Sequence, residues 1–162
     1  MIRATYPHYD HLSLDIDHAL RPQVCASVAA LQLANTTFDA IFYCQMLEHL
    51  TYKHFSPTLA EPRRVTRRRI VASLLDLPLF FLRMHRLRKL LPRFWNDFSL
   101  SSIHQPLHDF AVHGQHHWEI GVRGYPLSRI IKDIEKVGFS HFSHFRMAER
   151  PYWHFFLLDI TK

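Results

Sequence analysis

Glycine is scarce in this chain of 162 residues. It holds four glycines, and the first along the sequence is Gly114. Loops that cradle phosphates or nucleotides use glycine for positive backbone dihedral angles and for close approach of the backbone to the ligand. The residues before Gly114 therefore contain neither a Walker loop nor a G-x-G-x-x-G turn, and a nucleotide-binding function has to be argued without one.

Cysteine and long apolar runs are scarce as well. Cys25 and Cys44 are too few for a disulfide framework, and both lie in apolar stretches, which predicts reduced core residues. The stretch 70–82 is broken by Asp76 and Pro78 and falls short of the roughly 18 residues that a membrane helix needs. The N-terminus lacks the apolar core of a signal peptide. These features predict a cytoplasmic protein without a membrane partner.

The composition is that of a globular domain. Hydrophobic residues make up 48% and charged residues 21% of the chain, and the length fits one domain over residues 1–162. Apolar patterning predicts strands at 11–15, 24–28, 37–44, 69–75, 139–147 and 152–160, and helical segments at 45–50, 54–64, 83–91 and 128–137. This alternation predicts an α/β sheet.

Two of these segments have local features that can be tested. The near-continuous apolar end of 37–44 favours a buried parallel strand. In 128–137, Ser128 is expected to cap a helix and Gly138 to end it.

Acidic and polar residues follow two of the expected strands. Asp15 ends the first, and 45–49 follow the strand 37–44. In open α/β folds, ligands bind outside the carboxyl ends of strands, where an acid can accept hydrogen bonds from ribose hydroxyls. The alternative is that Asp15 or Asp17 caps the next turn, and that residues 47–50 serve packing and local pairing.

Three sequence blocks carry a resemblance to a known family. The string FDAIFYCQMLEHL, followed by a helix and RRVTRRRIVASLLD, resembles class I S-adenosylmethionine-dependent methyltransferases, and most of all the methyltransferase type 11 group. The block QHHWEIGVRGYPLSRIIKDIEKVGF is similar to one from a bacterial branch of that group. The resemblance runs from about Tyr9 to Leu158, with the blocks in the family's order.

The resemblance implies S-adenosylmethionine as cofactor and six positions that bind it. The first pair matches the ribose-binding acid and its neighbour beside adenine, the second pair matches positions next to the adenine ring, and the third lines the methionine part. Many relatives have Asp where this chain has Ser27. The pairs are Asp15 and Ile16, Ser27 and Val28, and Cys44 and Gln45.

The substrate side is expected to contain four further residues. Glu48 and His49 match the family's LEH signature. Trp118 can wall an apolar pocket, and Glu119 can orient a cation or take a proton. The alternative is that Trp118 belongs to the core and Glu119 pairs with Arg123. The sequence assigns no catalytic base.

The family opens with a strand and a glycine-rich loop that this sequence lacks. That strand would lie at the centre of the sheet, between the strands 11–15 and 37–44. The expected fold is thus a Rossmann-like class I methyltransferase sheet with flanking helices, without its N-terminal strand and glycine-rich loop. We expect the C-terminal part of a longer enzyme, or a truncated copy, that methylates an unidentified acceptor, with a small molecule favoured.

Three rival interpretations remain. The basic stretch 63–93 with its aromatic neighbours can bind RNA, or can be a solvated helix end before a buried strand. A chain without the cofactor loop can be an inactive interaction partner that self-associates through its incomplete sheet. The histidines at 113, 116 and 117 resemble metal ligands, but no paired motif supports them, and no metal is expected.

Overall fold

The computed structural model describes residues 8–76, 116–147 and 150–160. The predicted helix 83–91 and the basic residues around it lie outside these ranges. The strands are β1 (Leu14–Asp15), β2 (Val24–Cys25), β3 (Phe38–Cys44), β4 (Thr66–Leu75), β5 (Phe142–Met147) and β6 (Arg150–Asp159). The helices are α2 (Phe55–Val65), α4 (Leu127–Lys136) and the short 3-10 turns η1 (His18–Leu20), η2 (Leu47–His49) and η3 (Tyr52–His54).

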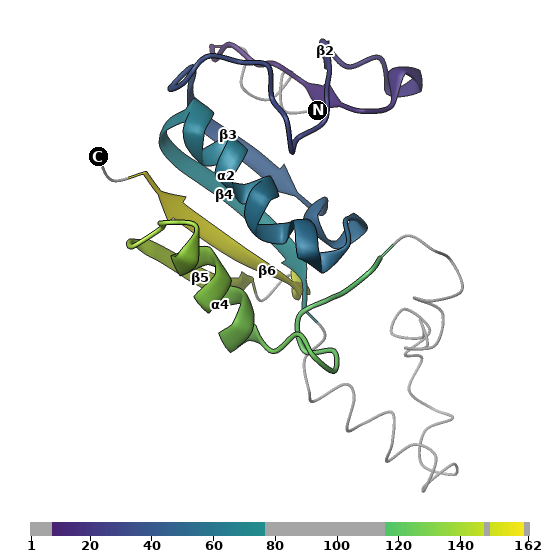
Figure 1. The fold of residues 1–162 in the computed structure, drawn as a ribbon, viewed down its shortest axis with the longest axis vertical. Coiled ribbons are helices and arrows are strands. Elements are labelled where there is room, and N and C mark those ends of the chain that lie inside the picture. Colours follow the sequence, from purple (N-terminus) through teal and green to yellow (C-terminus); the bar gives the residue numbers. More distant parts are fainter. Residues whose placement is uncertain (1–7, 77–115, 148–149, 161–162) are drawn as a thin grey trace, which may run out of the picture.

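The strands form two sheets. β1 and β2 pair in parallel, and a second sheet has the order β3-β4-β6-β5. In the second sheet β3 and β4 are parallel, while β6 runs antiparallel to β4 and to β5. Figure 1 shows the small β1–β2 pair beyond the β3 edge of the larger sheet. The predicted strands 11–15 and 37–44 are thus not paired with each other, and the mixed α/β fold is confirmed.

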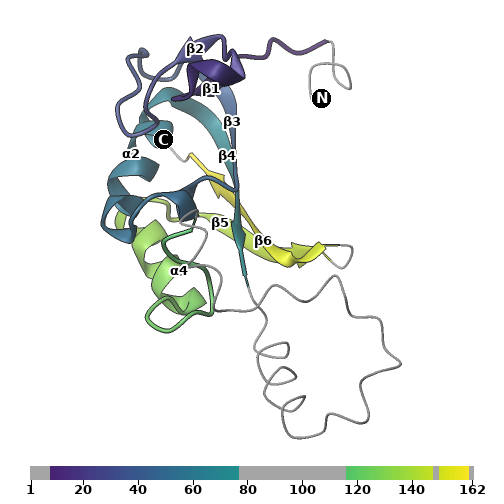
Figure 2. The same cartoon turned by 90° about the vertical axis from the view of Figure 1, so that its right-hand side faces the viewer.

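β4 lies inside the larger sheet, paired with β3 on one edge and with β6 on the other. One of its faces is apolar. Ile70, Ala72 and Leu74 alternate along that face and are almost completely buried. Phe156 and Leu158 of β6 lie in register beside Ala72 and Ile70 and are buried with them. Figure 2 shows α2 and α4 on the same side of this sheet, so the main core fills the space between that face and the two helices.

The two helices follow their apolar spacing. In α2, Phe55 and Leu59 are four residues apart and face the core. In α4, Ile130 and Ile134 do the same. The chain leaves α4 through Gly138, whose φ of 100° favours glycine. The prediction of α4 is confirmed to within one residue at each end.

Ser128 does not cap α4, so that prediction is wrong. The N-cap position is occupied by Pro126, and no side chain caps the helix there. Pro126 has an extended backbone, and its carbonyl accepts hydrogen bonds from the amides of Arg129 and Ile130. Ser128 lies two residues later, inside the first turn.

Three further sequence-based predictions need correction. β3 is not a buried strand but the edge strand of the larger sheet: Phe42 is 62% exposed, because it points away from the face on which Tyr43 joins the core. Cys25 and Cys44 are exposed and are not core residues, since the same edge and the short β2 leave them open to solvent. Residues 45–50 form the single 3-10 turn η2, and not the first turns of a longer helix.

A buried polar cluster closes the far end of the larger sheet. Asp76 follows β4 and is almost completely buried. It accepts hydrogen bonds from Arg146 Nε at 2.8 Å and from His154 Nδ1 at 2.8 Å. Burial raises the pKa of Asp76, but the hydrogen bonds and charges of these two partners outweigh it, so the pKa lies below its usual range. The cluster joins β4, β5 and β6 at this end.

Within the described ranges, no helix is long and apolar enough to cross a membrane.

Candidate functional site

Gln45 stands out at the carboxyl end of β3. Its φ is 55°, in the left-handed region that residues with a side chain rarely adopt. Its amide donates to the carbonyl of Ser73 on β4, which holds the turn in place. Strained backbone of this kind collects at functional sites. The sequence had singled out Cys44 and Gln45, and both are exposed here.

The other predicted cofactor residues lie around the small sheet. Asp15 ends β1, and its carboxylate accepts from the amide of Asp17, which in turn caps η1. Ile16 is 72% exposed and Ser27 is exposed, while Val28 packs against the main core. Asp17, and not Asp15, is therefore the cap of the next turn.

The predicted substrate-side residues gather at one place after β3 and β4. Glu48 and His49 lie in η2, directly after β3, and the carbonyl of Glu48 accepts from the amide of His117 at 2.8 Å. Glu119 lies beside Ile120, which forms a bridge with Asp76 after β4. Because η2 follows β3 and Ile120 bridges Asp76 at the end of β4, both segments meet at the carboxyl edge of this parallel pair.

His116 connects these residues and was not predicted as part of the site. Its Nδ1 lies 2.8 Å from Glu119 Oε1, and its ring packs edge-on against that of His49 with centroids 4.7 Å apart. The sequence presented His116 as a weak metal candidate. Its spacing of three residues from Glu119 is the one sequence feature that indicates this contact. The local alternative of a Glu119–Arg123 pair is not what the described side chains form.

Both carboxylates of this cluster are buried and incompletely bonded. Glu48 is 1% and Glu119 is 2% exposed. Within the described part of the chain, both oxygens of Glu48 and Oε2 of Glu119 have no hydrogen-bond partner. A buried polar group left unpaired costs roughly 1–3 kcal/mol. Such a cost is typical of a site that serves a ligand or a reaction.

Burial shifts the pKa values of the ionisable side chains in this cluster. Burial raises the pKa of Glu119 to about 7. Burial also raises the pKa of Glu48, against the nearby His116 and His49 charges, which lower it. Burial lowers the pKa of His116, and the charge of Glu48 partly offsets this. Glu119 therefore changes protonation near neutral pH.

Trp118 lies in the core beside this cluster. It is 3% exposed, and its indole N–H donates to the carbonyl of Leu50 at 3.0 Å. Its ring packs edge-on against Tyr52 and Phe55. Trp118 fixes the segment 116–120 to η2 and η3, and its role as a pocket wall stays a prediction.

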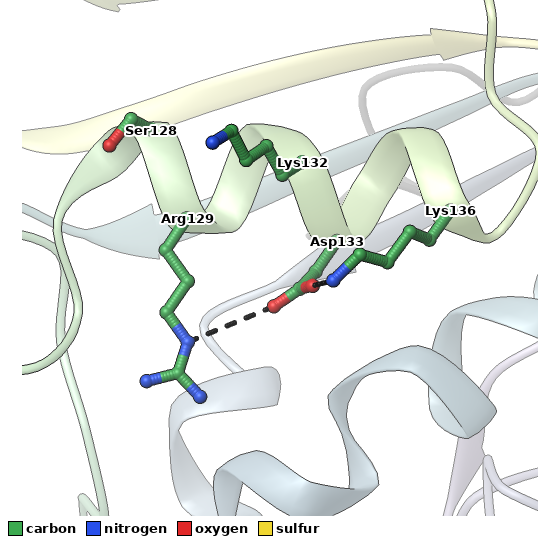
Figure 3. A pocket seen from close by; sticks show the side chains of 5 residues that line it. All are labelled: Ser128, Arg129, Lys132, Asp133 and Lys136. Atoms are coloured by element: carbon green, nitrogen blue, oxygen red, sulfur yellow. Dashed lines mark hydrogen bonds and ion pairs between the residues drawn. The ribbon is translucent and has the colours of Figure 1, made fainter.

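A hollow on the outer side of α4 is a different kind of feature. Figure 3 shows Asp133 between the basic side chains of Arg129 and Lys136, with ion pairs of 3.9 Å and 2.7 Å. Asp133 also accepts from Tyr52 Oη at 2.6 Å, and the Arg129 guanidinium lies 4.3 Å from the Tyr52 ring centroid. These contacts compensate the charges and attach α4 to η3. Ser128 and Lys132 also line the hollow.

The described part of the basic stretch, residues 63–76, makes local contacts within the protein. Arg64 binds Glu61 and the carbonyls of residues 31 and 33, Arg67 binds the carbonyls of residues 36 and 37, and Arg69 binds Asp159. The RNA-binding interpretation stays a prediction. No group of three or more metal-ligating side chains occurs among the residues that the structure describes.

Comparison with protein families supports the resemblance found in the sequence. The sequence pattern of a family described as a methyltransferase domain matches residues 8–71. No curated protein sequence matches the chain.

Similar solved structures share the fold at low identity. A putative methyltransferase from Bacillus halodurans is 9% identical with a TM-score of 0.57, over 99% of this chain and 87% of that one. The 1,6-didemethyltoxoflavin-N1-methyltransferase of Burkholderia thailandensis, solved with bound 1,6-didemethyltoxoflavin and S-adenosylhomocysteine, is 12% identical with a TM-score of 0.55, over 97% of this chain and 64% of that one. A putative O-methyltransferase from Nostoc punctiforme is 9% identical with a TM-score of 0.53, over 84% and 35%.

Several of the similar structures are much longer than this chain. The chain spans 50%, 35%, 30% and 43% of the length of four of the similar structures, including the one from Nostoc punctiforme. The shared fold and the match over residues 8–71 agree with the resemblance: the chain has a Rossmann-like methyltransferase fold, and residues 8–71 carry the sequence pattern of a methyltransferase domain.

Proposed function

We propose that this chain, alone or as part of a larger protein, binds S-adenosylmethionine and transfers its methyl group to a small-molecule acceptor. The observation that carries the proposal is Gln45, which leaves β3 in a left-handed conformation at the carboxyl edge of a parallel pair. Open α/β sheets bind their ligands at this carboxyl edge. A strained turn at this edge can place the backbone and side-chain atoms of Gln45 next to such a ligand. The methyltransferase-domain match over residues 8–71 includes this turn.

The cofactor side is supplied by two parallel pairs of strands. Asp15 at the end of β1 offers an acid for the ribose hydroxyls, and Ile16 beside it offers an exposed apolar side chain for adenine. Ser27 and Val28 follow β2, and Cys44 and Gln45 follow β3. These residues fit the adenosine and methionine parts of the cofactor. When bound, S-adenosylmethionine supplies an electrophilic methyl group on a positively charged sulfur.

The substrate side is the cluster of Glu48, His49 and Glu119, with Trp118 behind it. It lies at the same edge of the sheet as Gln45, since η2 follows β3 after a short turn. The protein's task in methyl transfer is to hold the acceptor and the methyl group in line and to exclude water. The buried carboxylates and the packed indole are suited to that task.

The test is calorimetric titration with S-adenosylhomocysteine. We expect wild-type protein to bind and Asp15→Asn to bind about 10-fold or more weakly, because hydrogen bonds to a charged group contribute roughly 1.5–3 kcal/mol. Asn keeps the contact with the amide of Asp17. Asp17→Asn, which keeps the cap of η1, is the matched control and should bind like wild type. Equal affinity of Asp15→Asn and wild type would contradict the proposed ribose contact, and no binding by wild type would contradict the function.

A further inference from the structure

Two histidines contact each other beside Asp76 through their ring nitrogens. Nδ1 of His144 on β5 lies 2.9 Å from Nε2 of His154 on β6, and the ring centroids are 5.0 Å apart. The other ring nitrogen of His154, Nδ1, lies 2.8 Å from Asp76 Oδ2. A hydrogen bond between two ring nitrogens needs an N–H on one side and a lone pair on the other.

Asp76 decides which nitrogen of His154 carries a proton. The pKa of Asp76 lies below its usual range, so its carboxylate is ionised at neutral pH and only accepts hydrogen bonds. Nδ1 of His154 is therefore an N–H donor. In a neutral His154 ring, Nε2 then has a lone pair, and Nδ1 of His144 has to donate to it. The two rings and the carboxylate thus form a directed chain of hydrogen bonds from β5 to the end of β4.

This geometry limits the number of protons that the two rings can hold. One added proton leaves the contact intact, because one of the two facing nitrogens still has its lone pair. A second added proton places an N–H on each side of the 2.9 Å contact, and the hydrogen bond is lost. Two positive imidazoles in contact also repel each other. In the unfolded chain the same two histidines take up both protons independently.

The charged groups around the two rings do not compensate a second positive charge. Among the described residues, Asp76 is the carboxylate that contacts them, and it also binds Arg146, which is positive and lies on the same face of β5 as His144. The neighbouring elements present uncharged or already paired side chains toward this face of the sheet: Leu74 of β4, Tyr152 of β6, Ile130 and Ile134 of α4, and His116 bound to Glu119 on the segment that bridges Asp76.

β5 is the element that depends on this contact. It pairs with β6 and, within the described ranges, with no other strand. The pairing becomes irregular between Arg146 and Met147, so side-chain contacts contribute to holding this end of the strand. Loss of the hydrogen bond between the two imidazoles is therefore expected to free the end of β5 before the rest of the sheet.

The pKa of His144 has the direction that this arrangement requires. Burial lowers it, and the charge of His154 lowers it further. The unfolded chain therefore binds more protons than the folded chain below the ordinary histidine pKa of 6.5. The stability that the contact contributes is complete above that value and is lost as the pH falls below it.

We propose that His144 and His154 form a pH-sensitive contact that holds β5 to β6 near neutral pH and releases the end of β5 when acid adds a second proton to the two rings. Both protons come from solvent and return to it when the pH rises, so the release is reversible. The proposal concerns the fold and stands apart from the methyl transfer proposed above.

The first arm of the test reads the two imidazoles of the wild-type chain by nitrogen NMR. At pH 8 we expect the proton on Nδ1 in both rings, with Nε2 unprotonated. Toward pH 5 the two rings should together take up one proton in the folded state, and a second only with loss of the folded-state signals of β5. A proton on Nε2 of His144 at pH 8, or two cationic rings beside an intact β5 at pH 5, would overturn the proposal.

The second arm compares urea denaturation of wild type and His144→Gln at pH 7 and pH 5. A glutamine amide can either donate to His154 Nε2 or accept from it, so the variant lacks the limit on protons. One proton fewer in the folded than in the unfolded chain raises the unfolding equilibrium constant about 10-fold per pH unit. Between pH 7 and pH 5 this constant should therefore rise by a factor about 10-fold larger in wild type than in the variant.

His141→Gln is the matched control. His141 is exposed and directly precedes β5, and its carbonyl keeps the bond from the amide of Asp159. The control should retain the pH dependence of wild type. Equal pH dependence of wild type and His144→Gln, or an equally strong change in His141→Gln, would contradict the proposal.

Hydrogen exchange at pH 5 locates the effect in the fold. The amides of β5 should exchange faster in wild type than in His144→Gln, while those of α2 should exchange alike. Equal exchange of the β5 amides in the two proteins would show that the contact does not hold this strand. If His144→Gln does not fold, the NMR of the wild-type chain decides.

Discussion

Two buried carboxylates of this protein respond to pH in opposite directions. Asp76 is held ionised by Arg146 and His154, so it stabilises the fold above its ordinary pKa, and that stability is lost as the pH falls through its lowered pKa. Glu119 has a raised pKa. The stability that Glu119 contributes is complete at pH values below its ordinary pKa of 4.5 and is lost as the pH rises through about 7. Ionised Asp76 therefore supports the structure at neutral pH, while Glu119 lowers the stability as it ionises.

This contrast predicts the behaviour of Glu119→Gln. The variant stays neutral at all pH values, so it should be more stable than wild type by about 3 kcal/mol at pH 8, from roughly 1.4 kcal/mol per pKa unit over the rise from 4.5 to about 7. The advantage should vanish near pH 4, where Glu119 is protonated in both the folded and the unfolded chain. Urea denaturation at both pH values measures it. A difference of equal size at pH 4 and pH 8 would show that the residue acts through packing and not through its charge.

At the scale of elements, the end of α2 holds the loop between β2 and β3. Arg64 Nε and Nη2 bind both carboxylate oxygens of Glu61 at 2.9 Å, and the same guanidinium binds the carbonyls of Leu31 and Leu33 at 2.8 Å. The amide of Leu31 donates to Glu61 in return. A planar fork of donors can make all these bonds at once, and a lysine ammonium cannot.

Arg64→Lys should therefore destabilise the fold although the charge is conserved. We expect a loss of about 1–2 kcal/mol, because several hydrogen bonds disappear and two carbonyls lose their partner. Arg68→Lys is the matched control: its side chain is 82% exposed and lies 3.8 Å from Asp39, so its effect should be below about 0.5 kcal/mol. Chemical denaturation of both variants at neutral pH measures the difference. Equal effects would mean that the Arg64 contacts contribute nothing beyond charge.

The elements also show what sequence patterns can predict. α4 was predicted closely because its isoleucine spacing and Gly138 are local features. The burial of β3 was predicted wrongly, because Phe42 and Tyr43 point to opposite faces of the sheet and only the face on which Tyr43 lies is covered by the core. The apolar sequence of the strand does not reveal that its other face is left uncovered.

Individual residues of the candidate site were predictable from the sequence, but the contacts of His116 that connect them were not. Glu48 and His49 were chosen through the family resemblance and Glu119 through its chemistry, and the structure places them together. His116 was missed because its role depends on residues of η2 that lie far away in the sequence. The cofactor roles of Asp15 and Gln45 stay predictions, although the left-handed backbone of Gln45 is a feature that no sequence pattern indicates.

For the whole molecule, the division of the strands into two sheets is the dominant feature. β3 pairs with β4 on one side, and within the described ranges no strand pairs with its other edge. Phe42 projects from this strand and is 62% exposed. An open edge with an exposed aromatic side chain is a template for pairing with another strand. We infer that a second copy of the chain covers this edge when the protein is concentrated.

Phe42→Glu should reduce that association. A charge on an edge strand opposes pairing between two identical edges, since like charges then face each other. Sedimentation velocity over a wide range of concentration should show a dimer for wild type and mainly monomer for the variant. Leu20→Glu, at an equally exposed apolar residue of η1, is the control and should leave the dimer intact. If both variants associate like wild type, the β3 edge is not the contact, and if both become monomers, general surface hydrophobicity and not the open edge drives association.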